Sequence, residues 1–121
     1  PEAGAVFRLE PGRARARLLA RLPAGSGRPA GLAVDAEGAP WLALEGGWAV
    51  ARLGPEGEVE RLLPLPVPAP TDLCFDGARL LVATARAGVA LDVLAQAPLS
   101  GRLLALAPGV SGAPEAAVRW R

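Results

Sequence analysis

Short apolar segments alternate with turn-forming residues along the whole chain. Each apolar run has a length typical of a strand and is too short for an ordinary helix. The runs are Ala5–Leu9, Arg17–Leu22, Gly31–Asp35, Trp41–Leu44, Trp48–Leu53, Val59–Leu65, Asp72–Phe75, Leu80–Thr84 and Arg102–Leu106. Between them stand turn signals such as Glu10-Pro11-Gly12 and Asp76-Gly77. The pattern predicts an all-β protein. Only Val89–Ala97, which lacks internal Gly and Pro, predicts two turns of helix, as an insertion.

The chain also repeats itself. Ala5-Val6-x-Arg8-Leu9 matches Ala49-Val50-x-Arg52-Leu53 at an offset of 44 residues. Pro29-x-x-Leu32-x-Val34-Asp35 matches Pro70-x-x-Leu73-x-Phe75-Asp76 at an offset of 41. An all-β repeat of this period is typical of the four-stranded blade of a β-propeller. We therefore expect a single partial propeller domain over 1–121, with blade-like repeats at roughly 4–27, 28–68 and 69–121. These make about 2.5–3 blades, fewer than a ring needs to close.

Composition excludes several function classes. Thirteen basic residues balance 12 acidic ones, so the net charge of +1 gives no reason to expect a nucleic-acid or membrane partner. The chain has no His and no Lys, which excludes an imidazole base and Schiff-base chemistry. Cys74 is the single cysteine, which excludes an intrachain disulfide, and we interpret it as a small core residue. Without a possible disulfide, nothing marks the protein as secreted, and we expect it to be cytoplasmic. The chain begins Pro1-Glu2 without a leader-like segment and reads as entered midway.

An ordered series of motifs runs from Arg28 to Pro114. It comprises Arg28–Gly38 followed by Trp41–Leu44, then Gly46-Gly47-Trp48-x-Val50-x-Arg52, Leu65–Thr71 with Cys74-Phe75, Leu81–Gly88, Gln96–Gly101 and Pro108–Pro114. This series resembles the gluconolactonase/regucalcin family of six-bladed β-propeller lactonases. The match covers most of this chain but only about the last two-fifths of a family member.

The resemblance implies a divalent metal, calcium or zinc, at the top of the central channel, where it would promote hydrolysis of a lactone. In the family the metal ligands are a Glu of the first blade, Asn residues of the middle blades and the Asp of a Pro-Asp-Gly motif. Here that motif is Pro29-Ala30-Gly31, so Ala30 occupies the position of the metal-binding Asp. We expect this chain alone to bind no metal tightly and to hydrolyse no lactone.

Five residues are candidates for lining the substrate channel: Ala30, Glu45, Trp48, Thr71 and Asp72. Thr71 is the repeat counterpart of Ala30. Asp72 either replaces the lost ligand or caps a turn. Glu45 either lines the site or is an ordinary hairpin carboxylate, and Trp48 stands at the channel mouth or belongs to the core. The catalytic residues cannot be assigned.

Other residues have structural interpretations. Asp35 and Asp76 occupy matching turns in two repeats, which indicates that they stabilise turns. Trp41 is expected in the core, and the alternating Arg13, Arg15 and Arg17 on a solvated edge strand.

Two functions remain open. The first is the C-terminal part of a metal-dependent lactone hydrolase whose ligand is a small-molecule lactone. The second is a non-catalytic propeller or half-propeller that binds a ligand or a partner. Its ring would close as a homodimer or with a separately encoded N-terminal half.

Overall fold

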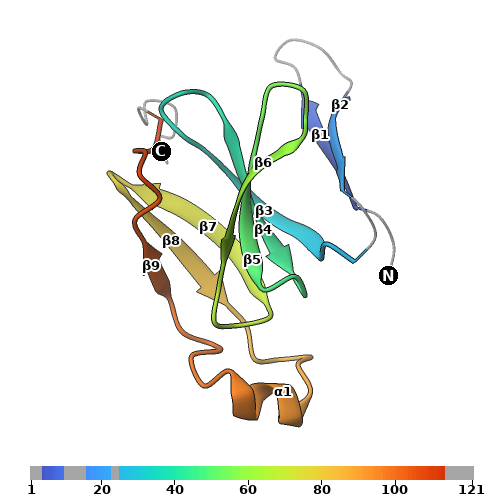
Figure 1. Cartoon of the computed structure of the whole chain (residues 1–121), viewed down its shortest axis with the longest axis vertical. Coiled ribbons are helices and arrows are strands. Elements are labelled where there is room, and N and C mark those ends of the chain that lie inside the picture. The colour runs from blue at the N-terminus through green and yellow to red at the C-terminus, as the bar shows by residue number, and fades with distance from the viewer. Residues whose placement is uncertain (1–3, 10–15, 23–24, 114–121) are drawn as a thin grey trace, which may run out of the picture.

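The computed structural model of the chain describes residues 4–9, 16–22 and 25–113, and Figure 1 shows how these segments are arranged. The strands are β1 (Gly4–Leu9), β2 (Ala16–Leu22), β3 (Arg28–Val34), β4 (Pro40–Glu45), β5 (Ala49–Leu53), β6 (Val59–Pro64), β7 (Pro70–Asp76), β8 (Arg79–Thr84) and β9 (Leu104–Leu106), and helix α1 (Leu91–Gln96) lies between β8 and β9. Every predicted apolar run contributes a strand, and the helix lies within the predicted segment. The all-β prediction is confirmed. Arg13 and Arg15 lie outside the described residues.

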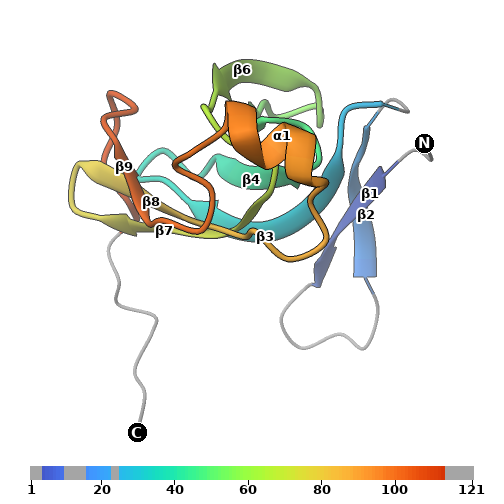
Figure 2. The ribbon, with the colours of Figure 1, turned by 90° about the horizontal axis from the view of Figure 1, so that it is seen from below.

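The strands form three antiparallel sheets in chain order. These are β1–β2, β3–β4–β5–β6 and β7–β8–β9, and within each sheet a strand pairs with the next one along the chain. In the sequence repeat, β1 and β2 are equivalent to β5 and β6, and β7 and β8 are equivalent to β3 and β4. The described residues therefore contain one complete four-stranded blade, flanked by the last two strands of one blade and the first three of another. The chain is part of a β-propeller, with β3 and β7 adjacent (Figures 1 and 2).

Two apolar clusters fill the spaces between the sheets. The first lies between β1–β2 and the middle sheet and consists of Leu22, Leu42, Leu44, Ala49, Ala51 and Leu53. The second, between the middle sheet and β7–β8–β9, is built around Trp41, which is fully buried. The Phe75 ring packs edge-on against Trp41 with 6.1 Å between ring centroids. Because the middle sheet is covered on both faces, four consecutive residues of β4 are buried instead of alternate ones. The core role predicted for Trp41 is confirmed.

Cys74 is exposed, so the prediction that it is a core residue is wrong. Its repeat counterpart in β3 is Ala33, which packs against the second cluster. Cys74 lies on the opposite side of β7 from that cluster, together with its cross-strand partner Leu81, which is only half-buried. Within 4–9, 16–22 and 25–113, no further sheet covers that side. An apolar strand predicts burial only when both of its faces have neighbours.

A buried carboxylate organises the β3–β4 turn. Asp35 is fully buried and accepts hydrogen bonds from the backbone N–H groups of Glu37 (2.9 Å) and Ala39 (3.0 Å). It also accepts bonds from Trp41 Nε1 at 2.9 Å and Arg52 Nε at 2.8 Å. Burial alone would raise the pKa of Asp35, but these four donors outweigh it and hold the pKa below its ordinary value. The structural interpretation of Asp35 is confirmed.

The repeat counterpart of this carboxylate behaves differently. Asp76 is exposed and forms a surface ion pair with Arg79 at 2.6 Å. The β7–β8 turn holds only Gly77 and Ala78 between its paired ends, so the longer Asx-type turn of the first repeat is not formed. The two aspartates are therefore not structurally equivalent, although the sequence aligns them.

In the described part of the chain, no helix is long and apolar enough to cross a membrane.

Candidate functional site

The inner strands β3 and β7 both carry a β-bulge near their start. The register of β3 against β4 shifts between Pro29 and Leu32, and that of β7 against β8 shifts between Pro70 and Asp72. Bulges re-aim side chains and often occur beside functional sites. Ala30 and Thr71 lie in these two bulges, as the repeat predicts. The bulges touch each other, because a Cβ on Gly31 would lie 2.6 Å from Asp72 Oδ1.

The polar atoms at the bulges serve local structure. Thr71 Oγ1 donates a hydrogen bond to the Ala83 carbonyl at 3.3 Å, and Asp72 Oδ1 accepts one from the Leu73 N–H at 2.9 Å. Ala30 contributes only a methyl group. No cluster of three or more potential metal-binding side chains occurs among the residues that the structure describes. A calcium ion needs six to eight oxygens and zinc about four ligands, so the described side chains do not fit the metal site that the family resemblance implies.

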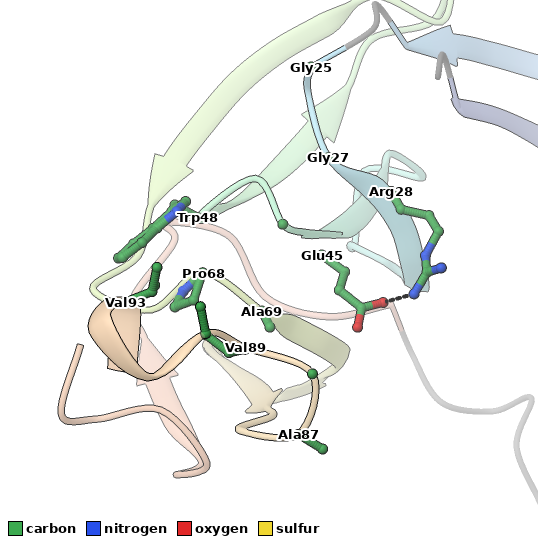
Figure 3. A pocket seen from close by; sticks show the side chains of 13 residues that line it. Gly25, Gly27, Arg28, Glu45, Trp48, Pro68, Ala69, Ala87, Val89 and Val93 are labelled. Carbon is green, nitrogen blue, oxygen red and sulfur yellow. Dashed lines mark hydrogen bonds and ion pairs between the residues drawn. The ribbon is translucent and has the colours of Figure 1, made fainter. Parts of the chain in front are cut away.

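A cleft of about 940 Å³ opens beside these bulges, at the end of the sheets where β3 and β7 begin (Figure 3). It is lined by Gly25, Gly27, Arg28, Glu45, Gly46, Trp48, Pro68, Ala69 and the segment Ala87–Ala90 with Val93. Glu45 and Trp48 are thus brought together in one cleft. The other three predicted channel residues, Ala30, Thr71 and Asp72, do not line the cleft; they follow the lining residues Arg28 and Ala69 along the chain.

The β4–β5 turn holds Trp48 at the edge of this cleft. The Pro68 carbonyl accepts a hydrogen bond from the Gly46 N–H at 2.8 Å, and the Trp48 carbonyl accepts one from the Leu65 N–H at 2.7 Å. A Cβ on Gly47 would lie 2.2 Å from the Ser26 carbonyl oxygen, so the turn packs tightly against the preceding loop. Trp48 itself lies in the turn, one residue before β5, and not in the strand as the sequence indicated. Its side chain is neither core nor fully free, with 38% exposure.

Across the cleft, an ion pair joins two neighbouring strands. Arg28 of β3 faces Glu45, the last residue of β4, in the strand register, and Arg28 Nη2 lies 2.5 Å from Glu45 Oε1. Glu45 therefore ends strand β4 directly before the β4–β5 turn. Its hydrogen bond and its charge raise the pKa of Arg28. Sequence reasoning missed Arg28, although opposite charges at paired hairpin positions are a signal for such a contact.

The third wall of the cleft belongs to the segment between β8 and β9. Val89 and Val93 line the cleft, while none of the residues of α1 is buried. Thr84 anchors the far end of this segment, because its Oγ1 accepts a hydrogen bond from the Gly101 N–H at 2.9 Å and donates one to the Arg102 carbonyl at 2.6 Å. The predicted insertion thus places two apolar side chains over the cleft.

Trp48 has a backbone φ of 57°, the only positive φ of a non-glycine residue in the described segments. We expect Trp48→Gly to be more stable than Trp48→Ala by about 1 kcal/mol, because both variants lose the indole but only glycine accepts this backbone conformation without strain. Urea unfolding of the two variants measures the difference. Equal free energies of unfolding would show that the turn carries no strain at this position.

Comparison with known proteins places this fold in a family. The family model described as "SMP-30/Gluconolactonase/LRE-like region" matches residues 5–86. The chain belongs to this family. It is 39% identical over 89 residues to L-arabinolactonase of Azospirillum brasilense, covering 73% of this chain and 30% of that enzyme. It is 37% identical over 103 residues to 6-deoxy-6-sulfogluconolactonase of Pseudomonas putida, covering 82% of this chain and 35% of that enzyme.

A solved structure supports the same assignment. The crystal structure of regucalcin from Agrobacterium tumefaciens, described as a calcium-binding protein, superposes with a TM-score of 0.74 at 30% identity. The alignment covers 81% of this chain and 34% of regucalcin. The chain therefore spans about a third of the length of the relatives it matches. The resemblance inferred from the motif series is confirmed.

Proposed function

We propose that this chain is the C-terminal part of a metal-dependent lactone hydrolase. In this proposal it supplies one side of the channel and the cleft beside it, while the metal ligands come from elsewhere in the ring. Membership of a family whose relatives include two named lactonases supports the reaction class. One observation supports the proposal that the metal ligands lie elsewhere in the ring: Ala30 lies in the bulge where the family resemblance puts a metal-binding Asp. The chain alone is then inactive.

The chemistry of the reaction limits what these residues can contribute. Lactone hydrolysis adds water to the ring carbonyl and breaks the ring C–O ester bond, which yields a hydroxy acid. A metal held by other parts of the ring would supply Lewis-acid chemistry at that carbonyl. In this chain Glu45 is engaged by Arg28, so the cleft offers a paired carboxylate and not a free base. The cleft would therefore bind and orient the lactone ring, and Trp48 and Val93 would exclude water from it.

We expect Ala30→Asp to raise the affinity of the chain for calcium by roughly tenfold or more. The new carboxylate would lie in the bulge of β3 and would supply oxygen atoms, which are the ligands that calcium prefers. Isothermal titration calorimetry with calcium chloride measures the affinity. Ala36→Asp, in the exposed β3–β4 turn, is the matched control. Saturable micromolar binding by the unmodified chain, or equal affinities for the two variants, would contradict the proposal.

A second candidate function is a non-catalytic binding module. The cleft favours it, because its lining combines an aromatic, several apolar and two charged side chains, whereas the described residues contain no cluster of three or more potential metal-binding side chains. In that case the ring is completed by a second copy or by a separately encoded N-terminal half. Ligand binding would then need no catalytic group.

The intact mass of the native protein in its source cells distinguishes the two candidates. A mass roughly two and a half times the 12.3 kDa of this chain would support the hydrolase, and the isolated native protein should then hydrolyse sugar lactones in a chelator-sensitive way. A mass of 12.3 kDa, with no lactone hydrolysis, would overturn the hydrolase proposal and leave the binding module.

A further inference from the structure

The backbone of the β4–β5 turn is strained at Trp48. A φ of 57° belongs to the left-handed region, where glycine is the least strained residue and a bulky residue is an outlier. Such strain costs on the order of 1–3 kcal/mol and tends to be found at ligand sites. Two glycines, Gly46 and Gly47, directly precede Trp48. The turn therefore places an indole where a third glycine would fit the backbone better.

The surroundings of this indole define one face of a binding site. Figure 3 shows Trp48 on one side of the cleft, near Val93 of α1, and the Arg28–Glu45 pair on the other side. Pro68 and Ala69 form the floor between them. Trp48 is held by backbone bonds at the turn but is not enclosed, since more than a third of its surface is exposed. The turn therefore fixes the position of Trp48, while its side chain is not packed in either apolar cluster.

The charged pair provides the complementary polar edge. Glu45 retains a second carboxylate oxygen, and the guanidinium of Arg28 retains further N–H donors, because only one contact joins them. Arg28 has 74% of its side chain exposed, so these donors face the cleft mouth and solvent. Hydroxyl groups both donate and accept, which lets them bind such a pair without a change of charge. The cleft thus has an aromatic wall and a mixed donor–acceptor wall.

We propose that Trp48 is the residue that selects cyclic ligands in this cleft, by stacking its indole on the ring of a hydroxylated lactone. The C–H bonds on one face of such a ring carry partial positive charge and meet the negative face of the indole. The ring hydroxyls then contact Glu45 and Arg28. Binding by these groups needs no metal. This inference rests on the proposed function only for the class of ligand, a lactone of a sugar acid.

The test compares a ring with its opened form. Isothermal titration calorimetry in the presence of EDTA measures binding of L-arabinono-1,4-lactone and of open-chain L-arabinonate to the 121-residue chain. We expect saturable binding of the lactone and at least tenfold weaker binding of arabinonate, which has no ring to stack. Trp48→Ala should weaken lactone binding at least tenfold and abolish the preference. Trp48→Phe, which keeps an aromatic face, should retain part of it. Val59→Ala, at an exposed apolar position on β6, should leave both affinities unchanged.

Two results would overturn the inference, and they differ in what they mean. If Trp48→Ala keeps the wild-type affinity and preference, the cleft binds the lactone by other contacts and the proposed function stands. If the wild-type chain binds neither compound in EDTA, metal-free recognition by the cleft is excluded. Chelator-sensitive lactone hydrolysis by the native protein would still support the hydrolase in that case. Circular dichroism shows whether Trp48→Ala still folds. If it does not, Trp48→Phe serves as the test, and it must then bind the lactone more weakly than the wild-type chain while keeping part of the preference for the lactone over arabinonate.

Discussion

Asp35→Ala should lower the free energy of unfolding by about 3–5 kcal/mol, the largest loss we expect from any single substitution at a polar residue of this chain. The carboxylate is fully buried and receives four hydrogen bonds. Its removal leaves the indole N–H of Trp41 buried without a partner and leaves Arg52, whose side chain is only 14% exposed, without its most buried counter-ion. Urea unfolding followed by circular dichroism measures the loss.

The repeat supplies a matched control for this experiment. Asp76 aligns with Asp35 in the sequence but makes only an exposed ion pair with Arg79. Asp76→Ala should therefore change the free energy of unfolding by less than about 1 kcal/mol. Asp35→Asn serves if the alanine variant fails to fold, because an amide keeps the size of the side chain and one acceptor. Equal effects at positions 35 and 76 would contradict a special role for the buried carboxylate.

The lowered pKa of Asp35 also predicts a pH dependence. The group releases its proton more readily in the folded state than in the unfolded chain, where an Asp pKa is about 3.9. Its contribution to stability is therefore complete above the unfolded pKa and is lost as the pH falls through the folded pKa. Asp35→Asn should remove this part of the acid dependence below about pH 4, which unfolding curves at several pH values would show.

The local sequence was sufficient to predict the strands. Short apolar runs bounded by Gly, Pro and Asp leave few alternatives to antiparallel strands joined by tight turns, and the repeat indicates which strands are equivalent. Trp41 could be assigned to the core because it matches the blade tryptophan of the family, and both faces of β4 are indeed covered. Cys74 could not be assigned in the same way. Its burial depends on whether another sheet packs against β7, and that is not encoded in the residues around it.

The candidate site was predictable to a lesser degree. Glu45 and Trp48 flank a glycine-rich turn, which indicated a position at the end of the sheets, and both line the cleft. Arg28 was missed because its role depends on the register between β3 and β4, and Val93 because it depends on where an insertion folds back. The repeat correctly placed Ala30 and Thr71 at equivalent bulges. It gave no indication that these residues would not line the cleft.

Gly31→Ala is expected to lower the free energy of unfolding by roughly 3 kcal/mol, for two additive reasons. Gly31 has a φ of 121°, a conformation that residues with a Cβ rarely adopt, and this costs about 1–3 kcal/mol. A Cβ at this position would also lie 3.0 Å from the Asp72 Cα and 2.6 Å from its Oδ1. Strands β3 and β7 would have to separate at the point where the two bulges meet, which adds the cost of overpacking.

Gly77→Ala separates the two contributions. Gly77 also has a positive φ, of 61°, but a Cβ there would meet nothing within 4 Å. Its substitution should therefore cost only the backbone term, about 1 kcal/mol. Urea unfolding of both variants gives the comparison, and the excess at Gly31 measures how tightly the two inner strands approach. If the two substitutions cost the same, the contact between the bulges is loose. Their geometry would then not hold Ala30 and Asp72 in fixed positions beside the cleft.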